Sequence, residues 1–252
     1  MTHIHWVGAG LSTHPGIRRL ASAGHAMIVW NRTTAKAKKA LEGQEASAVA
    51  AELSLEALAQ GVSAGDIVVS MLPGDFHVPI AKICLEKGCH FVSSSYISPE
   101  MAALDGAFES DNLVCINEVG LDPGIDHLMA HVLVEKYRNS VAFDDKNVLS
   151  FRSYCGGLSA TPNAFKYKFS WSPLGVLKAL RSTSKSIKNG DVWDVLKPWD
   201  AVQPICILKP DGTGETFEVY PNRDSLPFMR DYKFDPDWQV EQFVRGTIRL
   251  DG

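Results

Sequence analysis

The first half of the chain repeats one pattern: a short apolar run, a turn, and a segment whose apolar residues recur with helical spacing. The pattern starts at residues 3–7, which run into Gly8-Ala9-Gly10 and then a helical segment up to Gly24. Further apolar runs lie at 26–30, 66–72, 90–94 and 113–116, with helical segments at 35–41, 76–87 and 99–108. Parallel strands form near-continuous Val and Ile runs because helices cover both faces of their sheet. The pattern therefore predicts an α/β fold with a doubly wound parallel sheet.

The alternation ends at Leu121-Asp122-Pro123-Gly124, which favours a domain boundary near residue 122. Beyond it, Asp211-Gly212 has the composition of a hairpin turn. A helix is predicted at 125–137, and strands at 148–154, 205–208, 215–219 and 242–250. We therefore expect a Rossmann-type domain at residues 1–122 and a mixed α+β domain for substrate binding and dimerisation at 123–252.

Composition limits the partners that the chain can have. Its 252 residues carry a formal net charge of −4, which gives no electrostatic reason to expect nucleic acid or an anionic membrane surface. No apolar run reaches about 18 residues and the start lacks a signal-peptide pattern, so a cytoplasmic protein without membrane segments is expected. The five cysteines show no zinc-ligand spacing, and neither a metal site nor a disulfide scaffold is predicted.

The glycine turn after the first run is typical of a dinucleotide-binding site. Glycines let the backbone approach a pyrophosphate, and the following helix offers free N–H groups and a positive dipole end. Gly8, Gly10 and Leu11 are the predicted contacts. The sequence departs from G-x-G-x-x-G at Thr13, and its next glycine is Gly16. An ordinary strand-to-helix turn is the alternative, but the β/α units that follow favour the dinucleotide site.

The end of the second strand indicates which coenzyme fits. NAD enzymes commonly place an acidic residue there, which binds the ribose hydroxyls. This chain instead has Asn31, Arg32 and Thr33, and the Arg32 guanidinium can pair with a 2′-phosphate. NADP(H) is therefore favoured over NAD(H). The alternative is that Arg32 is only a solvated arginine at the start of a helix.

Small and hydroxylated residues follow two later strands. Ser70, Leu72 and Pro73 end one of them, and Ser94 and Ser95 end the next. Ligands of open α/β sheets bind outside the carboxyl ends of the strands. These five residues are therefore predicted to line the nicotinamide side of the groove.

Six segments, taken together and in order, resemble the saccharopine dehydrogenase family, and in particular its glutamate-forming saccharopine reductases. The segments are 94–99, 117–127, 153–158, 167–173, 220–225 and 245–247, which span almost the whole chain. The resemblance implies a homodimeric enzyme of lysine metabolism. Such an enzyme converts saccharopine, NAD(P)+ and water reversibly into glutamate, 2-aminoadipate 6-semialdehyde and NAD(P)H.

Three residues are implicated in proton transfer by this resemblance: Tyr96, Asp122 and Cys155. The resemblance does not indicate which of them moves the proton. Each also has a structural alternative. Tyr96 can be a hydrogen-bonded residue that only lines the site. Asp122 can cap the helix that follows it, and Cys155 can be a small buried apolar residue.

The implied substrate carries three carboxylates, which a weakly acidic protein must meet with individually placed cations. Arg223 beside Asn222 is the best candidate, because a guanidinium pairs with a carboxylate through two bonds. Lys168 can serve a second carboxylate, with a structural lysine as the alternative. Tyr96 and Gly156 complete the substrate contacts that the resemblance implies.

The chain departs from the family in two ways. Relatives continue past the strand at 245–247 with a segment that returns to the cofactor domain, whereas this chain stops at Gly252. An altered or inactive assembly is therefore one expectation. A proline that relatives tend to carry after Gly156-Gly157-Leu158 is also absent.

Two other functions compete with the saccharopine reaction. One is reductive C–N coupling on a polyamine such as carboxynorspermidine or homospermidine, whose cationic substrates call for carboxylates rather than Arg223 and Lys168. The other is a non-catalytic NADP(H)-binding scaffold, which the fold alone does not exclude. A scaffold has no need for the whole set of predicted catalytic residues.

Overall fold

The structure is a computed structural model that describes residues 2–44 and 47–251. The chain divides into two compact units, Met1–Ile125 and Asp126–Gly252. The boundary predicted near residue 122 lies in the turn just before this division. Across the described ranges, no helix is both long and apolar enough to cross a membrane.

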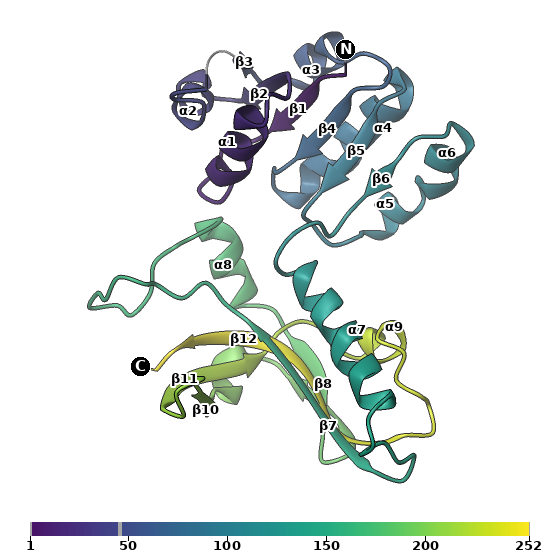
Figure 1. Cartoon of the computed structure of the whole chain (residues 1–252), viewed down its shortest axis with the longest axis vertical. Helices are drawn as coiled ribbons and strands as arrows, with labels where there is room; N and C mark the ends of the chain where they lie inside the picture. Colours follow the sequence, from purple (N-terminus) through teal and green to yellow (C-terminus); the bar gives the residue numbers. More distant parts are fainter. Residues whose placement is uncertain (1, 45–46, 252) are drawn as a thin grey trace. The chain divides into compact units, whose positions relative to one another are not determined.

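A six-stranded parallel sheet with strand order β3-β2-β1-β4-β5-β6 forms the N-terminal unit (Figure 1). Its strands are β1 (Ile4–Val7), β2 (Met27–Asn31), β3 (Ala48–Glu52), β4 (Ile67–Ser70), β5 (His90–Ser93) and β6 (Cys115–Ile116). Its helices are α1 (His14–Ser22), α2 (Thr34–Ala40), α3 (Leu55–Gly61), the 3₁₀ turn η1 (Gly74–Phe76), α4 (His77–Lys87), α5 (Pro99–Ala102) and α6 (Asp105–Ser110). This is the strand order of the Rossmann fold, so the predicted doubly wound sheet is confirmed.

Alternate side chains of the strands pack against helices on the two faces of this sheet. Trp6 and Val29 belong to a core that includes α1 and α2. Val7, Val68 and Phe91 belong to a second core that includes α3, α4, α5 and α6. Because both faces are buried, these strands show no regular alternation of apolar and polar residues.

Some predicted elements of this unit are wrong or missing. The single helix predicted at 99–108 is wrong, because α5 and α6 are separate helices. Leu104 N donates to Met101 O and Ala107 N to Leu104 O, and these i→i+3 bonds turn the chain between the two helices. The apolar run at 113–116 yields only the two-residue β6. Strand β3 was not predicted, because its alanine-rich segment has weak strand propensity.

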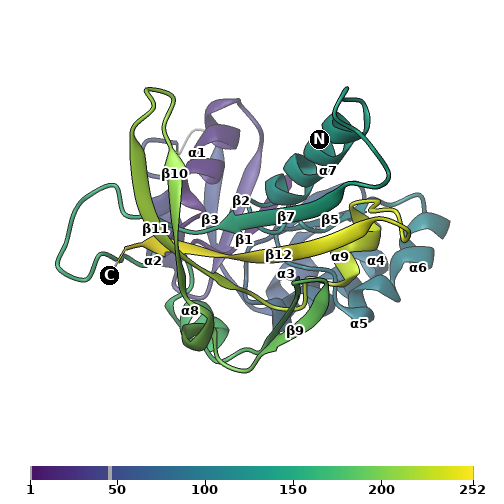
Figure 2. The same cartoon turned by 90° about the horizontal axis from the view of Figure 1, so that it is seen from below.

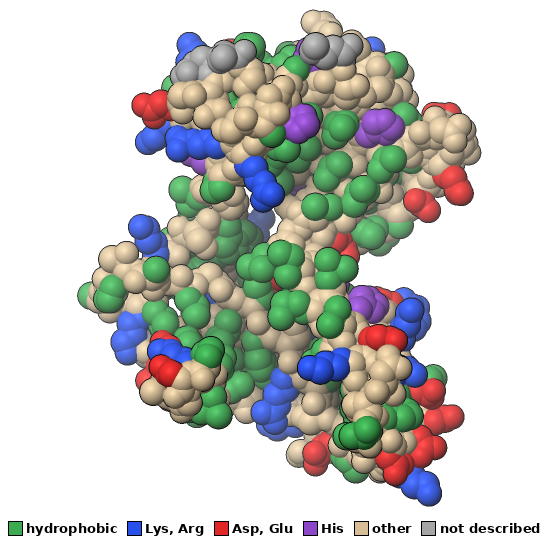
Figure 3. Space-filling model, in the orientation of Figure 1, with side chains coloured by type: hydrophobic (Ala, Val, Ile, Leu, Met, Phe, Trp, Pro, Cys, Tyr) green, Lys and Arg blue, Asp and Glu red, His purple; other side chains and the backbone are tan. Residues whose placement is uncertain are grey.

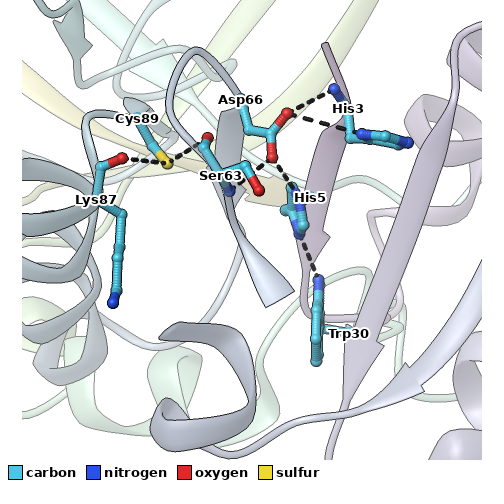
Figure 4. Close-up of polar contacts among 7 residues, drawn as sticks. All are labelled: His3, His5, Trp30, Ser63, Asp66, Lys87 and Cys89. Atoms are coloured by element: carbon cyan, nitrogen blue, oxygen red, sulfur yellow. Dashed lines mark hydrogen bonds and ion pairs between the residues drawn. The ribbon is translucent and has the colours of Figure 1, made fainter. Parts of the chain in front are cut away.

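A buried polar network joins β1, β2 and the turn before β4 (Figure 4). Trp30 Nε1 donates to His5 Nδ1 at 3.0 Å, and His5 Nε2 lies 3.2 Å from Asp66 Oδ2. An indole N–H can only donate, so His5 Nδ1 accepts and Nε2 carries the proton that goes to Asp66. Burial lowers the pKa of His5, although Asp66 opposes the shift. Burial acts to raise the pKa of Asp66, but hydrogen bonds from His3 N, Ser63 N and His5 together lower it.

The C-terminal unit is built around β12 (Gln239–Leu250). Its sheet has the order β10-β11-β12-β8-β9, and β7 pairs with β12 in parallel. The other elements are α7 (Ile125–Arg138), β7 (Val148–Cys155), α8 (Pro173–Ala179), β8 (Ser184–Lys188), β9 (Asp191–Val195), η2 (Pro198–Ala201), β10 (Gln203–Leu208), β11 (Gly214–Pro221) and α9 (Pro227–Asp231). This mixed sheet with its helices confirms the predicted α+β class.

Helix α7 packs against β7 and β12 (Figure 2). The shared core contains Ala130 and Val134 of α7, Phe151 of β7 and Phe243 of β12. Asp126 of α7 and Arg245 of β12 form a buried ion pair. The Arg245 guanidinium also lies 3.9 Å from the centroid of the Phe228 ring. The helix is therefore fixed to the sheet by apolar contacts along its length and by a charge pair at its start.

The predicted hairpin turn is confirmed. Antiparallel β10 and β11 flank Asp211-Gly212, and Gly212 has a φ of +83°. Asp211 Oδ1 accepts a hydrogen bond from Thr213 N at 2.9 Å, which closes the turn. The sequence analysis did not predict β8 and β9, whose segments are rich in Lys, Ser and Asp.

Candidate functional site

The glycine turn between β1 and α1 lies against the end of β4. Gly8 has a φ of +107°, and a Cβ at this position would lie 3.0 Å from Met71 O and 3.2 Å from Leu72 Cδ2. A Cβ at Gly10 would meet no atom within 4 Å, and the Leu11 side chain is exposed. The turn is therefore closed toward β4 and open at Gly10, as close approach of a pyrophosphate requires.

Thr13 and Gly16 explain the departure from the G-x-G-x-x-G pattern. Thr13 is buried, and its Oγ1 donates to Gly10 O at 3.0 Å, which ties the turn to the start of α1. A Cβ at Gly16 would lie 2.8 Å from Trp6 Cη2. Gly16 therefore provides the close helix–strand packing that the third glycine of the pattern normally allows.

Asn31 ends β2 beside this turn, and Arg32 and Thr33 follow it. The Asn31 side chain accepts from Ala9 N at 3.3 Å and donates to Thr33 O at 3.0 Å, so it joins the glycine turn to the start of the loop before α2. Arg32 is exposed. The helices α1 and α2 add two arginines and three lysines, and Figure 3 shows basic side chains gathered over this part of the unit. Helix α2 begins two residues after Arg32, so its lysines add positive charge near the predicted contact of a 2′-phosphate.

A cavity of about 480 Å³ opens at the carboxyl ends of β4, β5 and β6. Its lining residues are Gly74, Asp75, His77, Val78, Ser95, Tyr96, Ser98, Glu100, Met101 and Asn117. Ser95 and Tyr96 are the two predicted site residues among them. Ser94 instead lies beside Gly120, where a Cβ on the glycine would be 3.4 Å from Ser94 Cβ.

His77 is a cavity residue that the sequence analysis missed. It begins α4, and its side chain is buried between two predicted site residues. His77 Nδ1 lies 2.9 Å from Ser70 Oγ, and Nε2 lies 2.7 Å from Ser95 Oγ. Burial lowers the pKa of His77, which keeps the imidazole neutral near pH 7. The sequence offered no signal beyond a histidine at the start of a predicted helix.

Tyr96 and Asp122 form a direct pair. Tyr96 Oη donates to Asp122 Oδ1 at 2.5 Å, although the residues are 26 positions apart in the chain. Tyr96 follows β5, and Asp122 lies in the turn before α7. An O–H···O⁻ bond of this length is charge-assisted. The bond directs the phenol proton to the carboxylate.

Four predicted residues of the C-terminal unit lie at the ends of two strands. Cys155 and Gly156 lie at the end of β7, and Asn222 and Arg223 follow β11. Strand β7 ends opposite Thr247 of β12 and β11 ends opposite Gly246, on opposite edges of that strand. The structure thus brings these two pairs of residues to the same part of the sheet.

The backbone is constrained at two of these positions. A Cβ at Gly156 would clash with Ile248 O. Arg223 has a φ of +59° and an exposed side chain, and its carbonyl oxygen accepts from Lys185 N at 2.9 Å. Lys168 is exposed and lies apart from this group in sequence, between β7 and α8. Within the described part of the chain, no three His, Cys, Asp or Glu side chains could hold a metal ion.

Two family models together match nearly all of the chain. Residues 4–116 match the saccharopine dehydrogenase NADP binding domain, and residues 120–252 match the saccharopine dehydrogenase C-terminal domain. The chain belongs to the saccharopine dehydrogenase family. The resemblance predicted from the six segments is confirmed.

Relatives within the saccharopine dehydrogenase family support this placement. The saccharopine dehydrogenase [NADP(+), L-glutamate-forming] of Pyricularia oryzae is 36% identical over 98% of this chain and 54% of its own length. The enzyme of the same name from Schizosaccharomyces pombe is 35% identical over 100% of this chain and 55% of its own length. The chain therefore spans about half the length of these curated relatives.

Solved structures agree with the family assignment. Apo saccharopine dehydrogenase (L-Glu forming) from Saccharomyces cerevisiae matches with a TM-score of 0.82 at 33% identity, over 100% of this chain and 56% of that one. The homospermidine synthase of Legionella pneumophila matches with a TM-score of 0.62 at 10% identity, over 99% of this chain and 65% of that one. The second likeness shows a shared fold and does not extend to function.

Proposed function

We propose that this chain catalyses the NADP-dependent, L-glutamate-forming saccharopine dehydrogenase reaction. Saccharopine, NADP+ and water would be converted reversibly into glutamate, 2-aminoadipate 6-semialdehyde, NADPH and a proton. The observation that carries the proposal is the Tyr96–Asp122 hydrogen bond at the cavity beside the Rossmann sheet. The names of the full-length relatives support the same reaction.

The N-terminal unit has the features that NADP(H) requires. The turn at Gly8, Gly10 and Leu11 is open to a pyrophosphate, and Arg32 offers a guanidinium to the 2′-phosphate. The nicotinamide side is assigned to Leu72, Pro73, Ser94 and Ser95, whereas the predicted contact Ser70 has its hydroxyl buried against His77. When bound, the coenzyme accepts or supplies the hydride.

Tyr96 and Asp122 would move the proton of the reacting nitrogen. In saccharopine oxidation, the phenol oxygen of Tyr96 accepts the amine proton while its own proton passes to Asp122 Oδ1, so charge and protons balance. Cys155 is the third proposed catalytic residue. The substrate carboxylates are assigned to Arg223 and Asn222, with Gly156 and Lys168 as further contacts.

The test is saccharopine-dependent formation of NADPH by the purified chain. Tyr96→Phe keeps the ring and removes the proton carrier, so turnover should fall by about 10²–10⁴-fold. Tyr137→Phe is the matched control, because the Tyr137 hydroxyl contacts only a loop near Asp144 and Asn147 among the described residues. Turnover by Tyr96→Phe equal to that of the control would contradict the assigned role.

The same assay separates the competing functions. NADPH binding without turnover of any substrate would indicate a non-catalytic scaffold. Turnover of carboxynorspermidine but not saccharopine would indicate a polyamine enzyme, and either result contradicts the proposal. The homodimer and the cytoplasmic location stay predictions, and light scattering of the purified chain measures the first.

A further inference from the structure

Three side chains form a continuous hydrogen-bonded chain from the sheet to the cavity. Ser70 Oγ at the end of β4 contacts His77 Nδ1 at 2.9 Å, and His77 Nε2 contacts Ser95 Oγ at 2.7 Å. Ser70 is fully buried, whereas Ser95 is partly exposed and lines the cavity. His77 therefore links a buried hydroxyl to one that a ligand can reach.

The direction of these hydrogen bonds follows from counting donors and acceptors. Among the residues that the structure describes, His77 is the only hydrogen-bond partner of the Ser70 hydroxyl oxygen. If His77 Nδ1 carried the proton, the Ser70 hydroxyl proton would be buried without an acceptor, which is costly. Ser70 therefore donates to Nδ1, and the neutral imidazole carries its proton on Nε2 and donates it to Ser95.

The neutral state of His77 has two physical causes. Burial disfavours the imidazolium and lowers the pKa of the ring. His77 is also the first residue of the eleven-residue helix α4, and the positive end of the helix dipole disfavours a cation there. A neutral ring has one donor and one acceptor, so the hydrogen bonds keep one direction, from Ser70 through His77 to Ser95.

Ser95 is left with a proton to donate. Its oxygen already accepts from His77, and no acceptor for the Ser95 hydroxyl proton is present in residues 2–44 and 47–251. The hydroxyl lies at the cavity wall next to Tyr96 in sequence. A ligand oxygen is therefore the natural partner for it.

We propose that the Ser70–His77–Ser95 chain sets Ser95 as a hydrogen-bond donor to an acceptor oxygen of the bound ligand. Ser95 is the contact residue, and His77 is a positioning residue that acts through it. The acceptor is a carboxylate or carboxamide oxygen, which the substrate or the nicotinamide ring of the coenzyme supplies. The inference deepens the proposed function and rests on it for the identity of these ligands.

A pair of amide variants tests the direction of the Ser70–His77–Ser95 hydrogen bonds. In His77→Gln, the side-chain NH₂ can occupy the position of Nε2 and still donate to Ser95. In His77→Asn, the amide reaches only the position of Nδ1, so Ser95 loses its donor. We expect Ser95→Ala and His77→Asn each to weaken the affected ligand about 10-fold or more, as loss of an oriented bond to a polar ligand oxygen does. His77→Gln should restore most of that loss.

Two readouts distinguish the source of the acceptor oxygen. Fluorescence titration gives the Kd for NADPH, and steady-state kinetics give KM for saccharopine and kcat. A raised Kd for NADPH assigns the oxygen to the carboxamide, whereas a raised KM with unchanged Kd assigns it to a substrate carboxylate. The double variant His77→Asn with Ser95→Ala should be no worse than Ser95→Ala alone, because both changes remove the same bond.

Two outcomes would overturn the proposal. One is equal loss in His77→Gln and His77→Asn, which indicates a role in packing only. The other is a Ser95→Ala protein with wild-type Kd, KM and kcat. If the wild-type chain does not turn over saccharopine, the proposed function fails separately. The ¹⁵N NMR signals of the His77 ring still report the tautomer in that case, and a proton on Nδ1 would refute the assigned direction.

Discussion

Asp66→Asn tests the buried network that joins three strands of the Rossmann sheet. The carboxylate accepts from His3 N at 2.8 Å, Ser63 N at 2.9 Å and His5 Nε2 at 3.2 Å. An asparagine has one acceptor oxygen, and its better orientation keeps that oxygen toward Ser63 and His5. The NH₂ group then faces the His3 N–H. His5 cannot compensate by changing tautomer, because Trp30 donates to its Nδ1.

The expected cost follows from these contacts. One donor loses its acceptor, and because His3 is half-buried this costs about 1–2 kcal/mol. Two bonds to a charged acceptor become neutral bonds, which costs about 1 kcal/mol each. The free energy of unfolding of the N-terminal unit should therefore fall by about 3–4 kcal/mol. Urea unfolding followed by tryptophan fluorescence measures it, since Trp30 belongs to the network.

Asp111→Asn is the matched control in the same unit. Asp111 is exposed, and its substitution should change the free energy of unfolding by less than about 0.5 kcal/mol. A loss below about 1 kcal/mol for Asp66→Asn would refute the reasoning, because it would mean that the three hydrogen bonds are replaced without cost.

Acid should destabilise the N-terminal unit through its buried histidines and Asp66. His5 and His77 have lowered pKa values, so the unfolded state binds more protons than the folded state once the pH falls below the ordinary histidine pKa of 6.5. Stability should therefore decrease below that pH. The lowered pKa of Asp66 adds a second loss as the pH falls below 3.8, and this loss should be missing in Asp66→Asn.

The remaining predictions concern the cofactor and the substrate. Gly16→Ala should lower the free energy of unfolding by about 1–3 kcal/mol and weaken NADPH binding, because the new methyl group would push Trp6 and shift the glycine turn. Thermal unfolding measures the first effect, and NADPH titration measures the second. Arg32→Ala should weaken NADPH binding by about 1.5–3 kcal/mol and NADH binding much less, and equal losses in the two titrations would disprove the 2′-phosphate contact. Arg223→Lys should raise KM for saccharopine with little change in kcat, since a point charge replaces a two-bond fork; unchanged constants would make Arg223 a structural residue.

The sequence was informative where a residue type follows directly from a backbone requirement. Gly8 and Gly10 indicate the tight turn between β1 and α1, and the continuous apolar runs indicate the buried strands. It failed at β3, where alanine gives no clear strand signal and pairing with β2 decides the structure. The helix predicted at 99–108 failed because periodicity does not reveal a 3₁₀ turn between two short helices.

The candidate site was harder to predict, because its residues meet only through tertiary structure. The family resemblance implicated Tyr96 and Asp122 separately. Their direct hydrogen bond depends on how the turn before α7 returns to the end of β5. His77 escaped notice because its contacts are Ser70 at the end of β4 and Ser95 just after β5, which only the folded sheet brings together. The need for glycine at position 16 comes from the Trp6 ring that packs against it, and no local motif indicates this contact.

The position of β12 in the chain has a consequence for how the protein is made. This strand pairs with β7, β8 and β11, yet it is synthesised after all three of them. The sheet of the N-terminal unit is complete once β6 has been synthesised, so that unit can fold early during translation. Strand β7 must instead wait for a partner that lies about ninety residues downstream, with Phe243 joining Phe151 only then. The C-terminal unit should therefore remain exposed to chaperones for longer than the N-terminal unit during synthesis.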